Sequence, residues 1–195
     1  EPEFVRRQVE AANLGGFDAH IHACGDAGVR GALDAFEYVK VHHGHLSPRN
    51  TVCHLEFCHP DDVVRFALSG VENYGQVEVG DLGGVAIGGN AALDVAHLLA
   101  ELLENATSFC VGGESVTVVG RPVRDGYHLA IVDHGSGMSA DDMTVANAQL
   151  GEVAALHRDS GRMLGFQVVA RLARRHGITV VLTTTPGGTG VTAVV

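Results

Sequence analysis

The chain has 195 residues, enough for one domain of ordinary size or two small ones. Apolar residues make up 46% of the sequence and charged residues 18%, so the chain can build a hydrophobic core and is not disordered by composition. Its 13 basic and 23 acidic residues give a net charge of −10. This balance argues against nucleic acid or an anionic membrane surface as the main partner, because both require a basic surface.

Neither a membrane span nor an export signal is recognisable in the sequence. No run of about eighteen apolar residues is present, and the first residues lack the basic and apolar regions of a signal peptide. The four cysteines are irregularly spaced and are expected to be reduced thiols. We therefore expect a cytoplasmic protein with no membrane segment.

The first third of the chain alternates helical and extended patterns. Apolar spacing and turn residues predict a helix over 2–14, a strand over 17–22, a helix over 26–42, a strand over 51–57 and a short helix from residue 60. The order strand, helix, strand is typical of a parallel βαβ unit. We place the end of this βαβ segment at residue 60, so that residues 61–195 form a second domain.

After residue 70 the strands and helices follow in a different order. The pattern predicts short strands over 76–82 and 85–87, a helix over 91–108, strands over 115–120 and 127–133, an irregular segment over 134–162, a helix over 164–176, and a closing hairpin of 178–184 and 190–195. This order indicates an α+β fold, a two-layer sandwich in which helices cover one face of a mixed sheet.

Polar residues recur at helical spacing on the helix predicted over 91–108. His97, Glu101 and Asn105 follow one another at intervals of four, so they share one face of a helix that is otherwise rich in Leu and Ala. Such a stripe is also typical of the solvated face of an amphipathic helix. The stripe alone therefore leaves both interpretations open.

Two further segments carry residue types that suit a ligand site. Asp133 ends a predicted strand and is followed by Gly135 and Gly137, so a ligand's amino group could reach the carboxylate, although the same pattern occurs in ordinary turns. A glycine-containing loop over 161–165 leads into the helix predicted over 164–176. The unpaired N–H groups at a helix N-terminus are suited to phosphate, and an ordinary helix start is the alternative.

The three segments read Glu101-Leu-Leu-Glu-Asn105-Ala, Asp133-His-Gly-Ser-Gly-Met138 and Arg162-Met-Leu-Gly-Phe-Gln-Val-Val. In this order they resemble the nucleotide-binding motifs of the GHKL ATPase superfamily, which includes sensor histidine kinases, gyrase and heat-shock chaperones. The similarity is greatest to the ATP-binding domain of histidine-kinase-like proteins and extends from about residue 61 or 71 to residue 195. It implies a two-layer sandwich of the GHKL type that binds ATP and Mg²⁺.

The resemblance also implies a role for each residue of these motifs. Asn105 would hold Mg²⁺ at the ATP phosphates, Glu101 would orient or deprotonate the attacking nucleophile, and Asp133 would accept a hydrogen bond from the adenine amino group. The other expected nucleotide contacts are Gly135, Gly137, Met138, Gly161, Leu164, Gly165 and Thr189. Residues 139–160 fall where the family has a mobile lid.

The acceptor of a phosphoryl group is left open by the same resemblance. No helical hairpin with a phosphorylatable histidine is recognisable ahead of the domain, so phosphotransfer is expected only to a partner protein in trans. A serine kinase of the anti-sigma-factor type fits the same motifs. A non-catalytic protein that uses the fold to bind a regulatory partner is a further alternative.

Histidine and cysteine are concentrated in the first sixty residues, and both are natural zinc ligands. Histidines without a metal role are the alternative, because no paired Cys-x-x-Cys motif is present. The segments Gly16-Phe-Asp-Ala-His20-Ile-His22-Ala-Cys-Gly-Asp26 and Cys53-His54-Leu resemble metal-dependent amidohydrolases, over about residues 1–70.

This second resemblance implies an origin in a TIM barrel, with zinc ligands at His22 and His54. Only about a quarter of a barrel is covered, so hydrolase activity is not expected. The chain would then be a chimera of two families, whether a natural fusion, a rearranged gene or a synthetic sequence. A metal-binding module derived from an amidohydrolase is the alternative to a nucleotide-binding protein.

Overall fold

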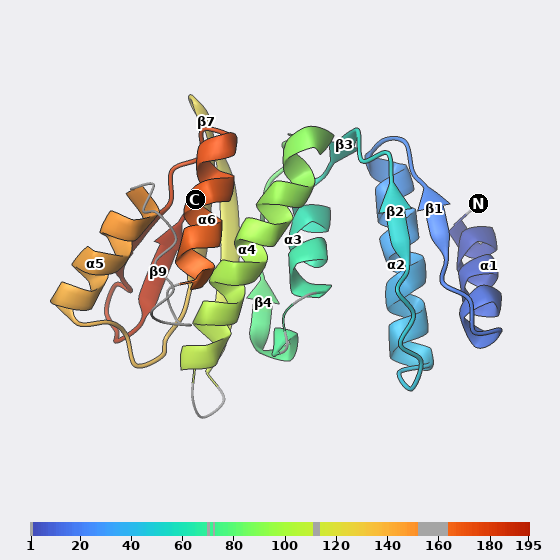
Figure 1. Ribbon diagram of the computed structural model, residues 1–195, viewed down its shortest axis with the longest axis horizontal. Helices are drawn as coiled ribbons and strands as arrows, with labels where there is room; N and C mark the ends of the chain where they lie inside the picture. Colours follow the sequence, from blue (N-terminus) through green and yellow to red (C-terminus); the bar gives the residue numbers. More distant parts are fainter. Residues whose placement is uncertain (1, 70, 72, 111–113, 152–163) are drawn as a thin grey trace. The chain divides into compact units, whose positions relative to one another are not determined.

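The computed structural model describes residues 2–69, 71, 73–110, 114–151 and 164–195 of the chain (Figure 1). The chain divides into two compact units. Unit 1 comprises Glu1–Arg65 and Ala86–Ala92, and unit 2 comprises Phe66–Val85 and Leu93–Val195. Helices α3 (Pro60–Ser69) and α4 (Gly89–Phe109) each contribute residues to both units.

Unit 1 begins with a βαβ arrangement. Its first elements are helix α1 (Pro2–Leu14), strand β1 (His20–His22), helix α2 (Asp26–His42) and strand β2 (Thr51–Cys53) (Figure 1). Strands β1 and β2 pair in parallel, and α2 connects them. The parallel βαβ unit predicted from the sequence is therefore confirmed.

A small apolar core joins α1 and α2 to strand β1. Val9 of α1 and Ala35 and Val39 of α2 are buried together, and Ile21 of β1 packs against them. Because successive side chains of a strand point to opposite faces, the neighbours of Ile21 in β1 project from the face that this core does not cover.

The prediction of one continuous strand over residues 51–57 is wrong. Strand β2 ends at Cys53, and His54 has a left-handed backbone with a φ of 63°, which a continuous strand does not contain. The chain is extended again in β3 (Phe57–Cys58), which pairs antiparallel with β5 (Ile87–Gly88). The described residues thus form three separate sheets, the β1–β2 pair, the β3–β5 pair and the larger sheet of unit 2.

Unit 2 is built on a five-stranded mixed sheet with the strand order β4-β6-β7-β9-β8. Strands β4 and β6 pair in parallel, and the other neighbours are antiparallel. The strands are β4 (Val77–Val79), which follows the short helix η1 (Tyr74–Gln76), β6 (Val116–Val123), β7 (Gly126–Val132), β8 (Val181–Thr184) and β9 (Val191–Val194).

Helices α4, α5 (Ala140–Gly151) and α6 (Leu164–Arg175) complete unit 2 (Figure 1). The mixed sheet and its helices form the α+β sandwich that the sequence predicts. None of the described helices is both long enough and apolar enough to cross a lipid bilayer.

The core of unit 2 follows from two periodicities. Alternate residues of β6 and β7 are buried, namely Val116, Val118, Leu129 and Ile131. In α4 the buried residues recur every three to four positions and include Leu98, Leu99, Leu102, Leu103 and Ala106. Burying one such Leu or Val contributes about 1.5–3 kcal/mol, so this stripe orients the helix and fixes which of its residues remain accessible.

A polar contact joins the first turns of α4 to the end of α6. The carboxylate of Asp94 accepts a hydrogen bond from Nε2 of His176 at 2.7 Å and lies 3.0 Å from the guanidinium of Arg175. The hydrogen bond from His176 and the charge of Arg175 lower the pKa of Asp94 from its ordinary value. This contact helps to set the relative position of two helices that both contribute to the site described below.

The prediction of an irregular segment over residues 134–162 is wrong for its central part, where α5 is a regular helix. The hydroxyl of Ser139 accepts a hydrogen bond from the N–H of Asp142 at 3.1 Å, which caps the N-terminus of the helix. The side chain of Asn147 then makes two hydrogen bonds to the backbone of Leu182 in β8, at 2.8 and 2.9 Å. Residues 152–160 of the expected lid lie outside the described residues.

Candidate functional site

Unit 2 contains a cavity of about 340 Å³. Residues from segments that are far apart in the sequence line it: Asn105 of α4, Asp133, Gly137 and Met138 after β7, and Phe166 of α6. Helix α5 and strands β8 and β9 supply the remaining walls. Four of the predicted site residues therefore line one cavity whose size suits a small-molecule ligand.

The walls of this cavity are mostly apolar. Leu102, Ala106, Ile131, Val145 and Phe166 are among the lining residues. Asp133 brings a carboxylate to this apolar surface, and only 6% of the residue is exposed. Such a cavity suits a ring that buries its faces against aliphatic side chains and presents a hydrogen-bond donor at its edge.

Asp133 is held in place by the backbone around it. One of its carboxylate oxygens accepts a hydrogen bond from the N–H of Gly135 at 3.0 Å, and its own N–H donates to the carbonyl of Val191 at 3.0 Å. Its carbonyl accepts a hydrogen bond from the hydroxyl of Thr185 at 2.9 Å. Burial raises the pKa of the Asp133 carboxyl above its ordinary value, although hydrogen bonds from backbone N–H groups partly offset this effect.

The glycines around Asp133 are required by close backbone contacts. A Cβ atom on Gly135 would lie 2.3 Å from the carbonyl oxygen of Phe109, so this loop packs directly on the end of α4. Gly137 has a φ of 73°, a conformation that favours glycine. Thr189 is exposed, and its carbonyl oxygen lies 3.5 Å from the position of a Cβ on Gly137.

The N-terminus of α6 lies beside the polar stripe of α4. A Cβ on Gly165 would be 3.0 Å from Oε2 of Glu101 and 3.5 Å from Nδ2 of Asn105, so the backbone of the first turn of α6 approaches both side chains. The Glu101 carboxylate is also 3.4 Å from Nε2 of His97, one turn earlier. Two of the predicted segments therefore meet at this point.

The amide of Asn105 is not fully engaged within the described part of the chain. Its Nδ2 atom is buried and has no hydrogen-bond partner among the described residues. An amide oxygen is a hard ligand of the kind that Mg²⁺ accepts, and the group lies next to a helix N-terminus that favours anions. The unpartnered Nδ2 is a hydrogen-bond donor that could meet an acceptor atom of an anionic ligand, and the amide oxygen is the atom that could hold Mg²⁺.

Gly161 and Leu164 are the remaining predicted contacts near the N-terminus of α6. Gly161 lies outside the described residues, and Leu164 is described only as the first residue of α6.

The contribution of α5 to the cavity was not predicted from the sequence. Asp142, Val145, Ala146 and Gln149 all line it. A local signal for this helix was present, because Ser139 is followed three positions later by Asp142, a spacing typical of a helix start.

In unit 1, the predicted zinc ligands His22 and His54 have ring centroids 4.9 Å apart. His22 also lies close to His20 and Cys53, whose side chains are 3.3 Å apart. Cys53 was not among the predicted ligands.

The chain was compared with known families and structures. Residues 90–195 match the family described as histidine kinase-, DNA gyrase B- and HSP90-like ATPases. The match starts beyond residue 89, and it gives no support to the resemblance of residues 1–70 to amidohydrolases. No match was found among curated proteins.

Several solved structures share the fold. A mycobacterial sensor histidine kinase, MprB, superposes with a TM-score of 0.57 at 18% identity, over 71% of this chain and 93% of that one. The ATP-binding domain of PrrB from Mycobacterium tuberculosis has a TM-score of 0.52 at 23% identity, over 70% and 92%. The histidine kinase domain of the E. coli osmosensor EnvZ has a TM-score of 0.51 at 17% identity, over 72% and 86%.

Proposed function

The chain belongs to the family of histidine kinase-, DNA gyrase B- and HSP90-like ATPases, and on that premise we propose that the cavity of unit 2 binds ATP together with Mg²⁺. The observation that carries this proposal is the carboxylate of Asp133, which is buried in a cavity with mostly apolar walls. The N–H of Gly135 already donates to one oxygen of this carboxylate, and the amino group of adenine would supply a further donor.

The adenine ring would lie between apolar side chains such as Ile131, Ala106 and Phe166. An ionised carboxylate only accepts hydrogen bonds, so Asp133 favours a base that carries an amino group at its edge. Gly135 and Gly137 keep the loop backbone close to the carboxylate. Met138 and the carbonyl side of Thr189 would border the same ligand.

The phosphates would lie toward α4 and the N-terminus of α6. Asn105 and the first backbone N–H groups of α6, including that of Gly165, are the groups suited to hold Mg²⁺ and the phosphate oxygens. Bound Mg²⁺ would neutralise phosphate charge. That contribution matters because the chain has a net charge of −10 and a single lysine, Lys40, which lies in unit 1.

Glu101 is the group best suited to act on a nucleophile, because its carboxylate lies beside Gly165 and next to Asn105 on the same helix. In phosphoryl transfer it would orient the attacking group or accept its proton while the bond from the γ-phosphorus to ADP breaks. The acceptor would be a histidine or serine of a partner protein in trans.

Calorimetric titration with a non-hydrolysable ATP analogue and Mg²⁺ tests the proposal. The wild-type chain is expected to bind one analogue per chain. Asp133→Asn should weaken binding roughly 10- to 100-fold, because it replaces a charged acceptor by a neutral one. Asp125→Asn is the matched control, since Asp125 is exposed in the turn between β6 and β7, and it should bind as the wild type does. Equal affinity of the Asp133→Asn and wild-type chains would refute the role of Asp133.

A further inference from the structure

Strand β1 has two faces of different chemistry. Ile21 packs against the apolar core of unit 1, whereas His20 and His22, on either side of it, are exposed. Because side chains alternate along a strand, the two histidines share the face that this core leaves uncovered. The register of β1 and β2 then places Cys53 directly opposite His22.

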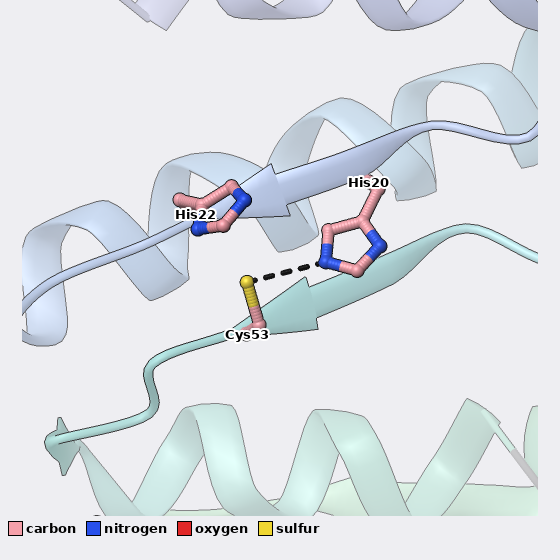
Figure 2. Close-up of side chains that lie close together, drawn as sticks. All are labelled: His20, His22 and Cys53. Atoms are coloured by element: carbon pink, nitrogen blue, oxygen red, sulfur yellow. Dashed lines mark hydrogen bonds between the residues drawn. The ribbon is translucent and has the colours of Figure 1, made fainter.

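The three side chains converge on this face (Figure 2). Nε2 of His20 lies 3.3 Å from Sγ of Cys53, and one ligand atom from each of His20, His22 and Cys53 lies within 4.8 Å of the other two. Cys53 is a free thiol of intermediate exposure, and both histidines are accessible to solvent. Figure 2 shows that all three come from two adjacent strands, His20 and His22 from β1 and Cys53 from the end of β2.

These distances are close to those that a tetrahedral metal site requires. With Zn–N bonds of about 2.0–2.1 Å and a Zn–S bond of about 2.3 Å, neighbouring ligand atoms are roughly 3.3–3.6 Å apart. The His20–Cys53 pair already has this spacing, at 3.3 Å. The longest separation, within 4.8 Å, can close by side-chain rotation because the histidines are exposed.

We propose that His20, His22 and Cys53 bind one zinc ion, with a water molecule as the fourth ligand. Two imidazole nitrogens and one thiolate form a ligand set that suits zinc, and the ion would link strands β1 and β2. Binding displaces the proton of the Cys53 thiol, which goes to solvent. His54 is not a ligand in this assignment, although its ring lies 4.9 Å from that of His22. This site does not depend on nucleotide binding in unit 2.

Titration of the reduced chain of residues 1–195 with Co²⁺ as a spectroscopic substitute for zinc tests this site. The wild type should bind one ion with a cobalt–thiolate charge-transfer absorption. Cys53→Ser should lose that absorption, and His20→Ala and His22→Ala should each bind the ion at least about 10-fold more weakly, since even the loss of an outer-shell partner costs that much. Circular dichroism shows whether each variant remains folded.

Matched controls are present in the same unit. Cys24→Ser and His45→Ala remove an exposed cysteine and an exposed histidine outside the cluster, and both should bind like the wild type. His54→Ala should also retain binding within about 3-fold, well below the cost of losing a ligand. The proposal is overturned if Co²⁺ gives no thiolate absorption, or if His54→Ala abolishes binding while Cys53→Ser does not. The second result would assign the ion to His22 and His54.

Discussion

Asp133 carries a carboxyl group whose ionised form is disfavoured by burial. Its pKa is raised above the ordinary value, chiefly because the side chain is removed from water. A raised pKa means that the folded chain binds a proton more tightly than the unfolded chain does. Between the ordinary pKa of about 3.9 and the raised value, the free energy of unfolding therefore falls as the pH rises.

The variant Asp133→Asn should reveal this effect. Its stability relative to the wild type is expected to improve as the pH rises from about 4 to 7, because asparagine can still accept the hydrogen bond from Gly135 but has no charge to bury. Urea unfolding of both chains across this pH range, without nucleotide, measures the difference. If the difference in unfolding free energy between the two chains stays constant with pH, or if the variant becomes relatively less stable as the pH rises, the raised pKa of Asp133 is contradicted.

The local patterns around Asp133 and Asn105 did not by themselves identify a site. Asp133 follows a strand and precedes two glycines, and Asn105 repeats a helical interval, but the same patterns fit a turn and a solvated helix face, so it was the resemblance to the GHKL superfamily that made both residues candidates. Cys53 was missed as a partner of His20 because the contact depends on the register of two strands separated by helix α2. Register is a property of the fold that short-range patterns do not specify.

At the scale of elements, the cavity depends on how closely the ends of strands β7 and β9 fit together. Gly190 lies at this junction with a φ of 139°, and a Cβ on it would be 2.1 Å from the carbonyl oxygen of Asp133. A Cβ on the neighbouring Gly188 would meet no heavy atom within 4 Å. Substituting Gly190 therefore probes the tight packing of this junction, and substituting Gly188 in the same turn serves as the control.

Gly190→Ala should lower the free energy of unfolding by more than about 2 kcal/mol, for two reasons. The new methyl group would clash with the carbonyl of Asp133 unless the backbone moves, and the φ of residue 190 is one that favours glycine. It should also weaken nucleotide binding, because Asp133 is displaced. Gly188→Ala is expected to change stability by less than about 0.5 kcal/mol. Chemical denaturation and nucleotide titration of both variants provide the measurements. Equal stability of the two variants would show that the junction is not tightly packed.

The elements that the sequence predicted well have strong local patterns. Helices α2, α4 and α6 carry apolar residues at helical spacing, and the closing strands β8 and β9 form the expected hairpin. Helix α5 was missed because its apolar residues are few and its anchor, the pair of hydrogen bonds between Asn147 and Leu182, joins residues distant in sequence. The break at His54 was missed because a left-handed conformation at a histidine has no clear sequence signal.

At the scale of the whole molecule, the two units carry different ligand chemistry. Unit 2 offers an apolar cavity with one buried carboxylate, and unit 1 offers imidazole and thiol groups on an exposed strand face. A strongly negative chain disfavours a bare polyphosphate, so nucleotide affinity is expected to depend on Mg²⁺. The family assignment and the geometry of the cavity support the same class of ligand for unit 2.

The most direct test of this account compares the thermal stabilisation of the chain by non-hydrolysable ATP and GTP analogues, each with Mg²⁺. Guanine carries a carbonyl oxygen where adenine carries the amino group, so it would place an acceptor against the Asp133 carboxylate. We expect the ATP analogue to raise the melting temperature, as a ligand that binds only the folded chain must, and the GTP analogue at the same concentration to have little effect. Equal shifts with the two analogues, or no shift with either, would contradict the proposed binding of adenine by Asp133.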